Sequence, residues 1–405
     1  MNAATDISDE VAKRVFRISC IALIVTAMTF AIRAGILPTL GEQYGLTGEE
    51  LGWIASMAFL GFPFAMIFGG ILYNAIGAKL IVWLAFIGHA LGLVLTIVAD
   101  GFWGLMISTF LVGFANGLVE AGCNPIIAQL YPNDKTAKLN KFHVWFPGGI
   151  VIGSLVSAGM TKLGMGWEAQ VATMLIPTAI YGVMMLGFSF PKLTTEDDST
   201  SGNLKALANP IYIFLAVCMT MTAVSEFGPG QWINKILEAS GATPMLILAL
   251  ITGIMALGRF YAGPLVHKLS PPGVLLVSAV LASFGLFLMT QLTGSAVYIA
   301  AVVFALGITY FWPTMIGCTA EYTPKTGALG MSLMGGAGMF AMSAWNPVIG
   351  GWVDSATATA ASAGLTGNEA ALAAGNEVLN SLILFPLVLI VLFAGFYWVM
   401  RKKTA

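Results

Sequence analysis

The feature that most constrains this chain is a run of about twenty apolar residues that recurs along most of its length. About a dozen such runs, each long enough to cross the hydrocarbon core of a bilayer, alternate with short polar loops. Only 9% of the 405 residues are charged, and 58% are hydrophobic. The formal net charge of -1 argues against a nucleic-acid partner. We therefore predict an all-α polytopic membrane protein with the lipid bilayer as its main partner.

The apolar pattern predicts twelve transmembrane helices. Six precede a polar stretch near the middle of the chain and six follow it. The predicted spans are Val15–Leu37, Leu51–Tyr73, Leu80–Ala99, Phe102–Leu130, His143–Met160, Val171–Phe190, Ile211–Ile236, Met245–Val266, Val274–Leu292, Ala296–Cys318, Leu329–Trp352 and Val378–Met400. Because the number is even, both chain ends are expected on the same side of the membrane.

The distribution of lysine and arginine predicts which side that is. If the N-terminus is cytoplasmic, 14 of the 18 basic residues fall in cytoplasmic segments, and only Lys162 and Lys235 fall in external ones. The remaining two, Arg33 and Arg259, lie within or at the edge of spans. Positive residues in short loops are retained in the cytoplasm. We therefore expect an N-in, C-in protein of a bacterial inner membrane.

The two halves of the chain resemble each other. The sequence Gly70-Ile71-Leu72 precedes a basic loop at Lys79, and Gly263-Pro264-Leu265 precedes one at Lys268, an offset of 193 residues. This repeat predicts an N-terminal six-helix half (1–190), a cytoplasmic linker (191–208) and a C-terminal six-helix half (209–405). Two similar six-helix halves are the plan of the major facilitator transporters, whose substrate binds near the midplane between the halves.

Several motifs refine this resemblance. The fourth predicted helix contains Glu120-Ala121-Gly122-Cys123-Asn124-Pro125, and the fifth is introduced by Leu139-Asn140 and an aromatic-rich stretch that ends in a Gly149–Gly153 pair. Together with Glu226 to Trp232 and Gly258-Arg259-Phe260, they resemble the fucose/galactose/glucose proton symporters of the major facilitator superfamily. The resemblance implies proton-coupled uptake of a monosaccharide or related small polar solute by alternating access.

The chain also departs from that pattern. The first predicted helix carries Arg33 where those symporters have an acidic residue, and the fifth carries His143 and Phe146 in place of a glutamine and an asparagine. These differences bear on the identity of the substrate.

Two carboxylates inside predicted spans are candidate coupling groups. A charged side chain in a bilayer is costly and usually faces a cavity or marks an ion path. Glu120 is either the protonatable coupling group, which we favour, or a structural partner of Arg33. Glu226 is either a second site group, in a helix that Gly228-Pro229-Gly230 is expected to interrupt, or a hydrated group at the outer mouth.

The two arginines within the spans have more than one interpretation. Arg33 is a snorkelling residue near the interface, a partner of an acid, or a cationic ligand for an acidic substrate. Arg259, in a Gly-Arg-Phe sequence, is expected to pin the loop at the cytoplasmic end of the eighth helix and not to bind substrate.

Amide and aromatic side chains complete the candidate substrate site. Amides and carboxylates hydrogen-bond hydroxyl groups, and aromatic faces stack under rings. The candidate substrate ligands, in addition to Arg33, are Asn124, His143, Trp145, Gln231, Trp232, Trp312 and Asn346.

Other classes of function find little support in the sequence. No ATP-binding or catalytic motif is present, so we expect neither an enzyme nor a cofactor, and the histidines and cysteines lack metal-ligand spacing. We expect a monomer whose partners are a small-molecule substrate and protons, with sodium as the alternative coupling ion. A carrier of a sugar acid and a non-transporting membrane sensor remain alternative functions.

Overall fold

The computed structural model describes residues 7–46, 48–191, 199–231, 233–237 and 239–404, and the regular secondary structure over them is helical throughout. The helices are α1 (Asp9–Tyr44), α2 (Gly48–Ile97), α3 (Gly101–Leu130), α4 (Lys135–Phe142), α5 (Trp145–Lys162), α6 (Trp167–Thr173), α7 (Leu175–Met185), α8 (Thr200–Ala206), α9 (Pro210–Gln231), α10 (Ile233–Ile236), α11 (Pro244–Phe260), α12 (Ala262–Gln291), α13 (Val297–Ile308), α14 (Phe311–Tyr322), α15 (Gly327–Ser362), α16 (Gly367–Leu382) and α17 (Leu384–Thr404), with short 3-10 turns η2 (Gly294–Ala296) and η3 (Pro324–Thr326).

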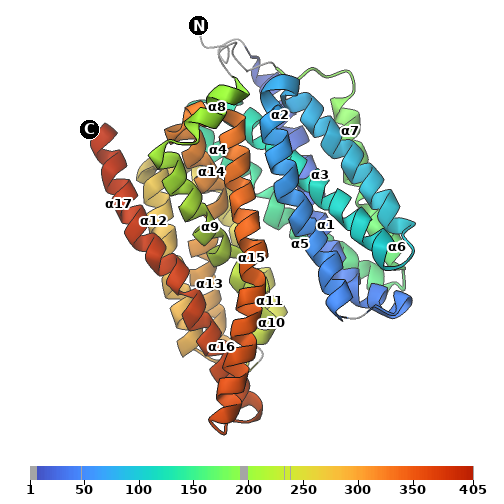
Figure 1. Cartoon of the computed structure of the whole chain (residues 1–405), viewed down its shortest axis with the longest axis vertical. Helices are drawn as coiled ribbons and strands as arrows, with labels where there is room; N and C mark the ends of the chain where they lie inside the picture. Colours follow the sequence, from blue (N-terminus) through green and yellow to red (C-terminus); the bar gives the residue numbers. More distant parts are fainter. Residues whose placement is uncertain (1–6, 47, 192–198, 232, 238, 405) are drawn as a thin grey trace.

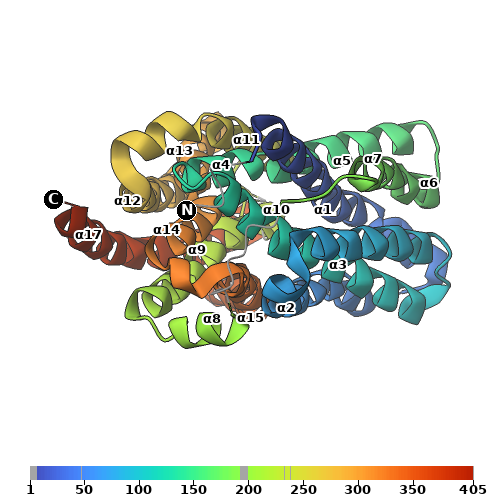
Figure 2. The same cartoon turned by 90° about the horizontal axis from the view of Figure 1, so that it is seen from above.

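The helices form two groups that lie side by side (Figure 1). Helices α1–α7 belong to the first group and α9–α17 to the second, with α8 between them at one end. At that end the short helix α4 reaches across and packs against α14 and α12 of the second group. Helix α1 begins and α17 ends at that same end, which we call the terminal face. Seen from above, α2 lies beside α15 and α5 beside α11 where the groups meet (Figure 2).

Two long helices contain sharp backbone breaks at equivalent places. Helix α2 breaks at Gly77 (φ 74°, ψ 164°), and α12 breaks at Ser270 (φ 61°, ψ 159°). The two residues are 193 positions apart, the same offset as the sequence repeat. Glycine adopts this conformation without a steric penalty, whereas serine does so under strain. Each break joins two of the predicted spans through a very short turn.

Among the described residues, nine helical stretches are long and apolar enough to cross a membrane. One of them, Trp53–Ile97, includes the break at Gly77 and covers two predicted spans. Other predicted spans contain two shorter helices, as at α6 with α7 in Val171–Phe190 and α13 with α14 in Ala296–Cys318. The count of twelve crossings and the N-in orientation remain predictions.

The prediction that Gly228-Pro229-Gly230 breaks the helix of the seventh span is wrong. Helix α9 continues through Gly228, Pro229 and Gly230 to Gln231. Pro229 is therefore accommodated inside a continuous helix, and a helix can bend at a proline without ending there.

Small residues let neighbouring helices of each group approach closely. A Cβ atom on Gly117 of α3 would lie 2.2 Å from the Phe62 carbonyl oxygen of α2, and one on Gly307 of α13 would lie 2.2 Å from the Ala282 nitrogen of α12. Such contacts leave no room for a larger side chain. Close backbone approach of this kind is how helices associate in lipid.

The two groups are joined at the terminal face by polar contacts between α4 and α14. The Thr136 hydroxyl and backbone N–H donate to Glu321 Oε1 at 2.5 and 3.3 Å. Lys135 Nζ donates to the Ala320 carbonyl at 3.2 Å, and Asn140 Nδ2 donates to Thr314 Oγ1 at 3.2 Å, one turn further into the molecule. A carboxylate from the second group thus caps the N-terminal turn of a helix in the first.

The predicted linker contains helix α8, which binds both groups. Asn203 Nδ2 donates to the Lys325 carbonyl of the second group at 2.9 Å, and Asn203 Oδ1 accepts from Asn74 Nδ2 of the first at 2.5 Å. The Thr200 hydroxyl also donates to the Ile71 carbonyl of α2. The described part of the linker therefore reinforces the closed terminal face.

Replacing the strained residue at the second break is expected to stabilise the protein. Ser270→Gly should raise the free energy of unfolding by about 1 kcal/mol, because glycine adopts the observed backbone angles without strain. The reverse change at the first break, Gly77→Ser, should lower it by about 1–3 kcal/mol. Thermal unfolding of the two variants in one detergent measures both effects. Equal melting temperatures for both variants and the unmodified protein would contradict the interpretation of the breaks.

Removing the cap supplied by Glu321 is expected to loosen the terminal face. Glu321→Ala leaves the first turn of α4 without its acceptor, so opening at this face should become about tenfold more populated. The measurement is thiol labelling of Ser332→Cys, a buried position on α15 that packs against Gly70 of α2. The four native cysteines are replaced beforehand. Labelling that does not change would show that these contacts do not hold the face closed.

Candidate functional site

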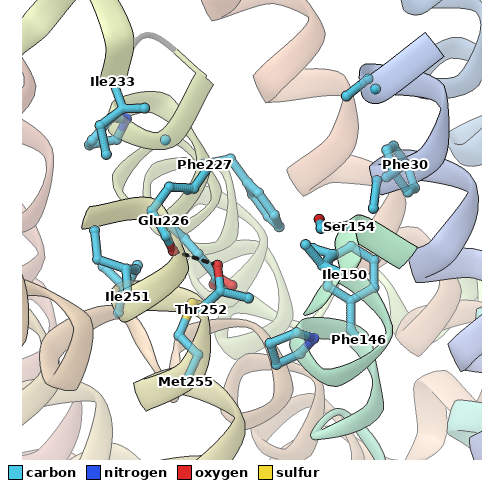
Figure 3. A pocket seen from close by; sticks show the side chains of 18 of the residues that line it. Phe30, Phe146, Ile150, Ser154, Glu226, Phe227, Ile233, Ile251, Thr252 and Met255 are labelled. Carbon is cyan, nitrogen blue, oxygen red and sulfur yellow. Dashed lines mark hydrogen bonds between the residues drawn. The ribbon is translucent and has the colours of Figure 1, made fainter. Parts of the chain in front are cut away.

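A cavity of about 720 Å³ lies between the two helix groups and is lined by residues of both (Figure 3). Helices α1 and α5 form one wall, and α9, α10, α11, α12, α13 and α16 contribute to the other. Lys162, at the last residue of α5, lies at the far end of the cavity from the terminal face. Phe146, Glu226 and Phe227 lie at the opposite, inner end, which we call the floor.

A narrow crevice continues beneath the floor. Its volume is about 10 Å³, close to the lower limit for one water molecule. It is lined by Glu120, His143, Phe146, Glu226, Phe227, Arg259, Trp312 and Met339. The crevice is therefore too small for an organic solute, but it brings the titratable side chains of both groups to one place.

The first group contributes a buried chain of three polar side chains. Asn124 Nδ2 donates to Glu120 Oε2 at 2.9 Å, one helical turn along α3. Asn124 Oδ1 lies 3.1 Å from His143 Nε2, so this nitrogen carries the donated proton. The other ring nitrogen, Nδ1, lies 4.0 Å from Glu120 Oε1. His143 reaches this position because it stands at the junction between α4 and α5.

The second group contributes a buried ion pair. Arg259 Nη2 donates to Glu226 Oε1 at 2.8 Å, and Arg259 Nε donates to the Thr309 carbonyl at 2.7 Å. Arg259 is 1% exposed and Glu226 is 6% exposed. A buried charge is tolerated when it is paired and hydrogen-bonded, as these two are.

Two longer hydrogen bonds link the groups at the floor. Arg259 Nη1 donates to the His143 carbonyl at 3.3 Å, and the Trp312 indole donates to Glu120 Oε2 at 3.5 Å. The polar side chains therefore form one cluster, which we call the floor cluster: Glu120, Asn124, His143, Glu226, Arg259 and Trp312. It contains two carboxyl groups and one guanidinium.

The expectation for Arg259 is wrong. It does not pin a surface loop, because α11 continues almost directly into α12 and the side chain points into the centre of the molecule. Glu226 is likewise buried in the floor and is not a hydrated group at the outer mouth.

The alternative in which Arg33 pairs with Glu120 is also wrong. The Arg33 guanidinium lies over the Phe30 ring at 5.0 Å and near the Phe59 ring at 5.9 Å. Within the described residues it forms no ion pair, and it does not line the cavity. The positive charge of Arg33 therefore interacts with aromatic faces and not with a carboxylate.

The remaining predicted ligands have different positions. Trp145 is 38% exposed and lines neither the cavity nor the crevice. Asn346 is half-buried in α15, away from both linings. Trp232 and the side chain of Gln231 lie outside the described residues. Of the predicted set, Glu120, Asn124, His143, Glu226 and Trp312 come together in the floor cluster.

Most residues of the cavity wall were not predicted from the sequence. Phe30, Phe227, Ser154 and Thr252 line the cavity, and none of them was a candidate ligand. One signal was available: Thr252 precedes Arg259 by seven residues, two helical turns, so both share a face of α11. The aromatic residues resemble any others in apolar spans, and nothing local distinguishes them.

A second buried polar network is separate from this site. His89 of α2 lies 3.0 Å from the Tyr181 hydroxyl and 2.8 Å from Asn116 Oδ1. Asn116 Nδ2 donates to Thr29 Oγ1 at 2.9 Å. These contacts tie α1, α2, α3 and α7 together, so His89 and Asn116 have a packing role within the first group.

Comparison with known proteins decides the family. A family model described as Major Facilitator Superfamily matches residues 19–345. The chain belongs to the Major Facilitator Superfamily. It is therefore a multi-pass membrane transporter of small molecules and not an enzyme.

Individual superfamily members are similar at a lower level. A crystal structure of the E. coli fucose:proton symporter FucP superposes with a TM-score of 0.70 at 17% identity, over 92% of this chain and 98% of that one. Myo-inositol transporter 1 of Candida albicans is 26% identical over 34% of this chain and 25% of its own length. Quinolone resistance protein NorA of Staphylococcus aureus is 31% identical over 25% of this chain. The chain matches only about a quarter of the length of these last two relatives.

Breaking the buried ion pair from one side is expected to destabilise this superfamily member strongly. Arg259→Met leaves the Glu226 carboxylate buried without its partner and should cost about 3–5 kcal/mol of stability. The double variant Glu226→Gln/Arg259→Met removes both charges and should recover much of that loss. Thermal unfolding of the single and double variants measures the difference. A double variant no more stable than Arg259→Met would contradict this account of the pair.

Proposed function

We propose that the protein is a proton-coupled secondary transporter that carries a small organic solute across a bacterial inner membrane by alternating access. The observation that carries the proposal is the cavity between the two helix groups, with two buried carboxyl groups beneath its floor. A solute in the cavity would contact both groups, and a proton at the floor would act on the contacts that join them.

The different partners of the two carboxyl groups suggest different roles. Glu226 has a counter-ion in Arg259. Glu120 is hydrogen-bonded to the Asn124 amide and the Trp312 indole, which are neutral. Glu120 can therefore gain or lose a proton without breaking an ion pair, and its bond to Trp312 spans the two groups. We assign proton coupling to Glu120, with His143 Nδ1 as a nearby site for the same proton.

The conformation fits one half of an alternating-access cycle. The terminal face is closed by α4, α8 and α14, whereas the cavity extends from the floor towards the other face. With basic residues retained in the cytoplasm, the terminal face would be cytoplasmic and this conformation would face outward. The return half of the cycle requires the terminal-face contacts to separate.

The sequence resemblance makes a monosaccharide the first substrate to test. The names of two relatives point to fucose and to myo-inositol. A sugar acid is less favoured, because Arg33, the cation that suggested it, lies outside the cavity lining.

The coupling role is tested with Glu120→Gln in proteoliposomes. The variant should lose accumulation driven by a pH gradient, because the neutral amide cannot exchange a proton, while counterflow of the same solute continues. Fucose, galactose, glucose and myo-inositol form the first panel, and Glu369→Gln, on the exposed part of α16, is the matched control.

Undiminished accumulation by Glu120→Gln would contradict the assignment. Accumulation that follows a sodium gradient in place of a pH gradient would identify sodium as the coupling ion. Binding without uptake or counterflow for every compound that binds would favour the sensor alternative.

A further inference from the structure

The walls of the cavity differ from those expected around a polyol. From the floor to Lys162 at the far end, most of the lining side chains are aromatic or aliphatic and come from both groups, and the polar ones among them are mainly serine and threonine hydroxyl groups. The lining includes Phe30, Phe146, Ile150, Phe227, Ile251 and Met255. Figure 3 shows these side chains directed towards a common space. The wall therefore favours an apolar surface on the solute.

Most hydroxyl groups of the cavity wall already form hydrogen bonds within the protein. Thr252 donates to the Leu248 carbonyl of its own helix at 2.8 Å. Ser157 donates to Gln170 Oε1 at 2.6 Å, and Thr161 Oγ1 accepts from Gln170 Nε2 at 3.1 Å. Among the described residues, Ser154 is the lining hydroxyl without a hydrogen bond. A sugar ring would leave several of its hydroxyl groups without protein partners in this cavity.

One strong acceptor stands at the floor. Glu226 Oε1 accepts from Arg259, but Glu226 Oε2 is buried and has no hydrogen-bond partner within the described residues. The backbone of Trp312 lies near the same carboxyl group, without a hydrogen bond of good geometry to Oε2. A buried carboxylate oxygen left without a donor requires an explanation, and a donor on a ligand supplies one.

The charges of the floor cluster favour a positively charged donor. The cluster has two carboxyl groups and one guanidinium, so it carries excess negative charge whenever both carboxyl groups are ionised. The rings of Phe30, Phe146 and Phe227 line the adjoining space, and aromatic faces attract cations. The cavity volume also lies in the range of about 300–1,000 Å³ that holds drug-sized ligands.

We propose that the cavity binds an amphipathic organic amine, with its apolar body against the Phe30, Phe146 and Ile251 walls and its ammonium group donating to Glu226 Oε2. The proposal rests on the transport function proposed above, in that this cavity is taken as the substrate site. It names a substrate class different from the monosaccharide suggested by sequence resemblance, and direct binding distinguishes them.

The test uses four probes on the purified, full-length protein. 4-Phenylbutylamine carries the apolar body and the cation, 4-phenylbutanol the same body with a neutral donor, 4-phenylbutyrate the same body with an anion, and galactose represents the sugars. Binding is measured by ligand-induced thermal stabilisation over a concentration series. The amine should bind at least about tenfold more tightly than the anion and the sugar, with the alcohol between them.

Two variants localise the binding. Glu226→Gln removes the charged acceptor and should weaken amine binding about tenfold while leaving the alcohol little changed. Ile251→Asn adds a polar group to the wall and should weaken the amine and the alcohol alike, without touching the ion pair. Leu257→Asn, at an exposed position on the same helix α11, is the matched control and should change neither. If Glu226→Gln does not fold, Glu226→Asp and Ile251→Asn carry the test.

Each outcome decides the inference. Preferential stabilisation by the amine that both cavity variants weaken supports it. Stabilisation by galactose and not by the amine overturns it, and so does amine binding that neither cavity variant changes. Failure of all the amphipathic probes to bind also overturns it. Amine binding without pH-dependent transport would instead contradict the proposed coupling while leaving the binding site in place.

Discussion

The centre of the molecule depends on the Arg259 guanidinium. Arg259 is almost fully buried, so its charge is met chiefly by Glu226 and by the carbonyl groups of Thr309 and His143. The ion pair holds α9 against α11, the Thr309 contact holds α13, and the His143 contact reaches the first helix group. One side chain therefore fixes the position of four elements at the floor of the cavity.

The two carboxyl groups at the floor, Glu226 and Glu120, have different partners in this arrangement. Glu226 uses one oxygen to hold the second group together, and its other oxygen has no hydrogen-bond partner within the described residues. Glu120, bound to neutral donors, forms the link between groups that protonation can change. Under the proposed coupling, stability depends on Glu226 and conformational change on Glu120, and both side chains line the same crevice.

The sequence predicts the membrane class and much of the floor cluster, because those signals are local. A carboxylate in an uncharged run is conspicuous, and Glu120 and Asn124 are one helical turn apart. The depth of Arg259 could not be predicted, because a cation beside a predicted loop resembles an interfacial residue until the path from α11 into α12 is known. The exposure of Trp145 depends on the rotation of α5, which no local pattern gives. The residues of the cavity wall could not be predicted, because a phenylalanine that faces the cavity differs from one that faces lipid only in the direction of its side chain.

The contacts that join the groups are unequal in strength. At the floor, two hydrogen bonds cross between the groups, at 3.3 and 3.5 Å. At the terminal face, four hydrogen bonds of 2.5 to 3.3 Å join α4 to α14, and α8 binds both groups in addition. More hydrogen bonds must therefore break to separate the groups at the terminal face than at the floor. In the proposed alternating-access cycle, the larger share of the cost of separation then lies at the terminal face, on the other side of the floor from a bound solute. In kinetic terms, turnover would then be limited by a motion common to every solute, and solutes of different affinity would cross at similar maximal rates.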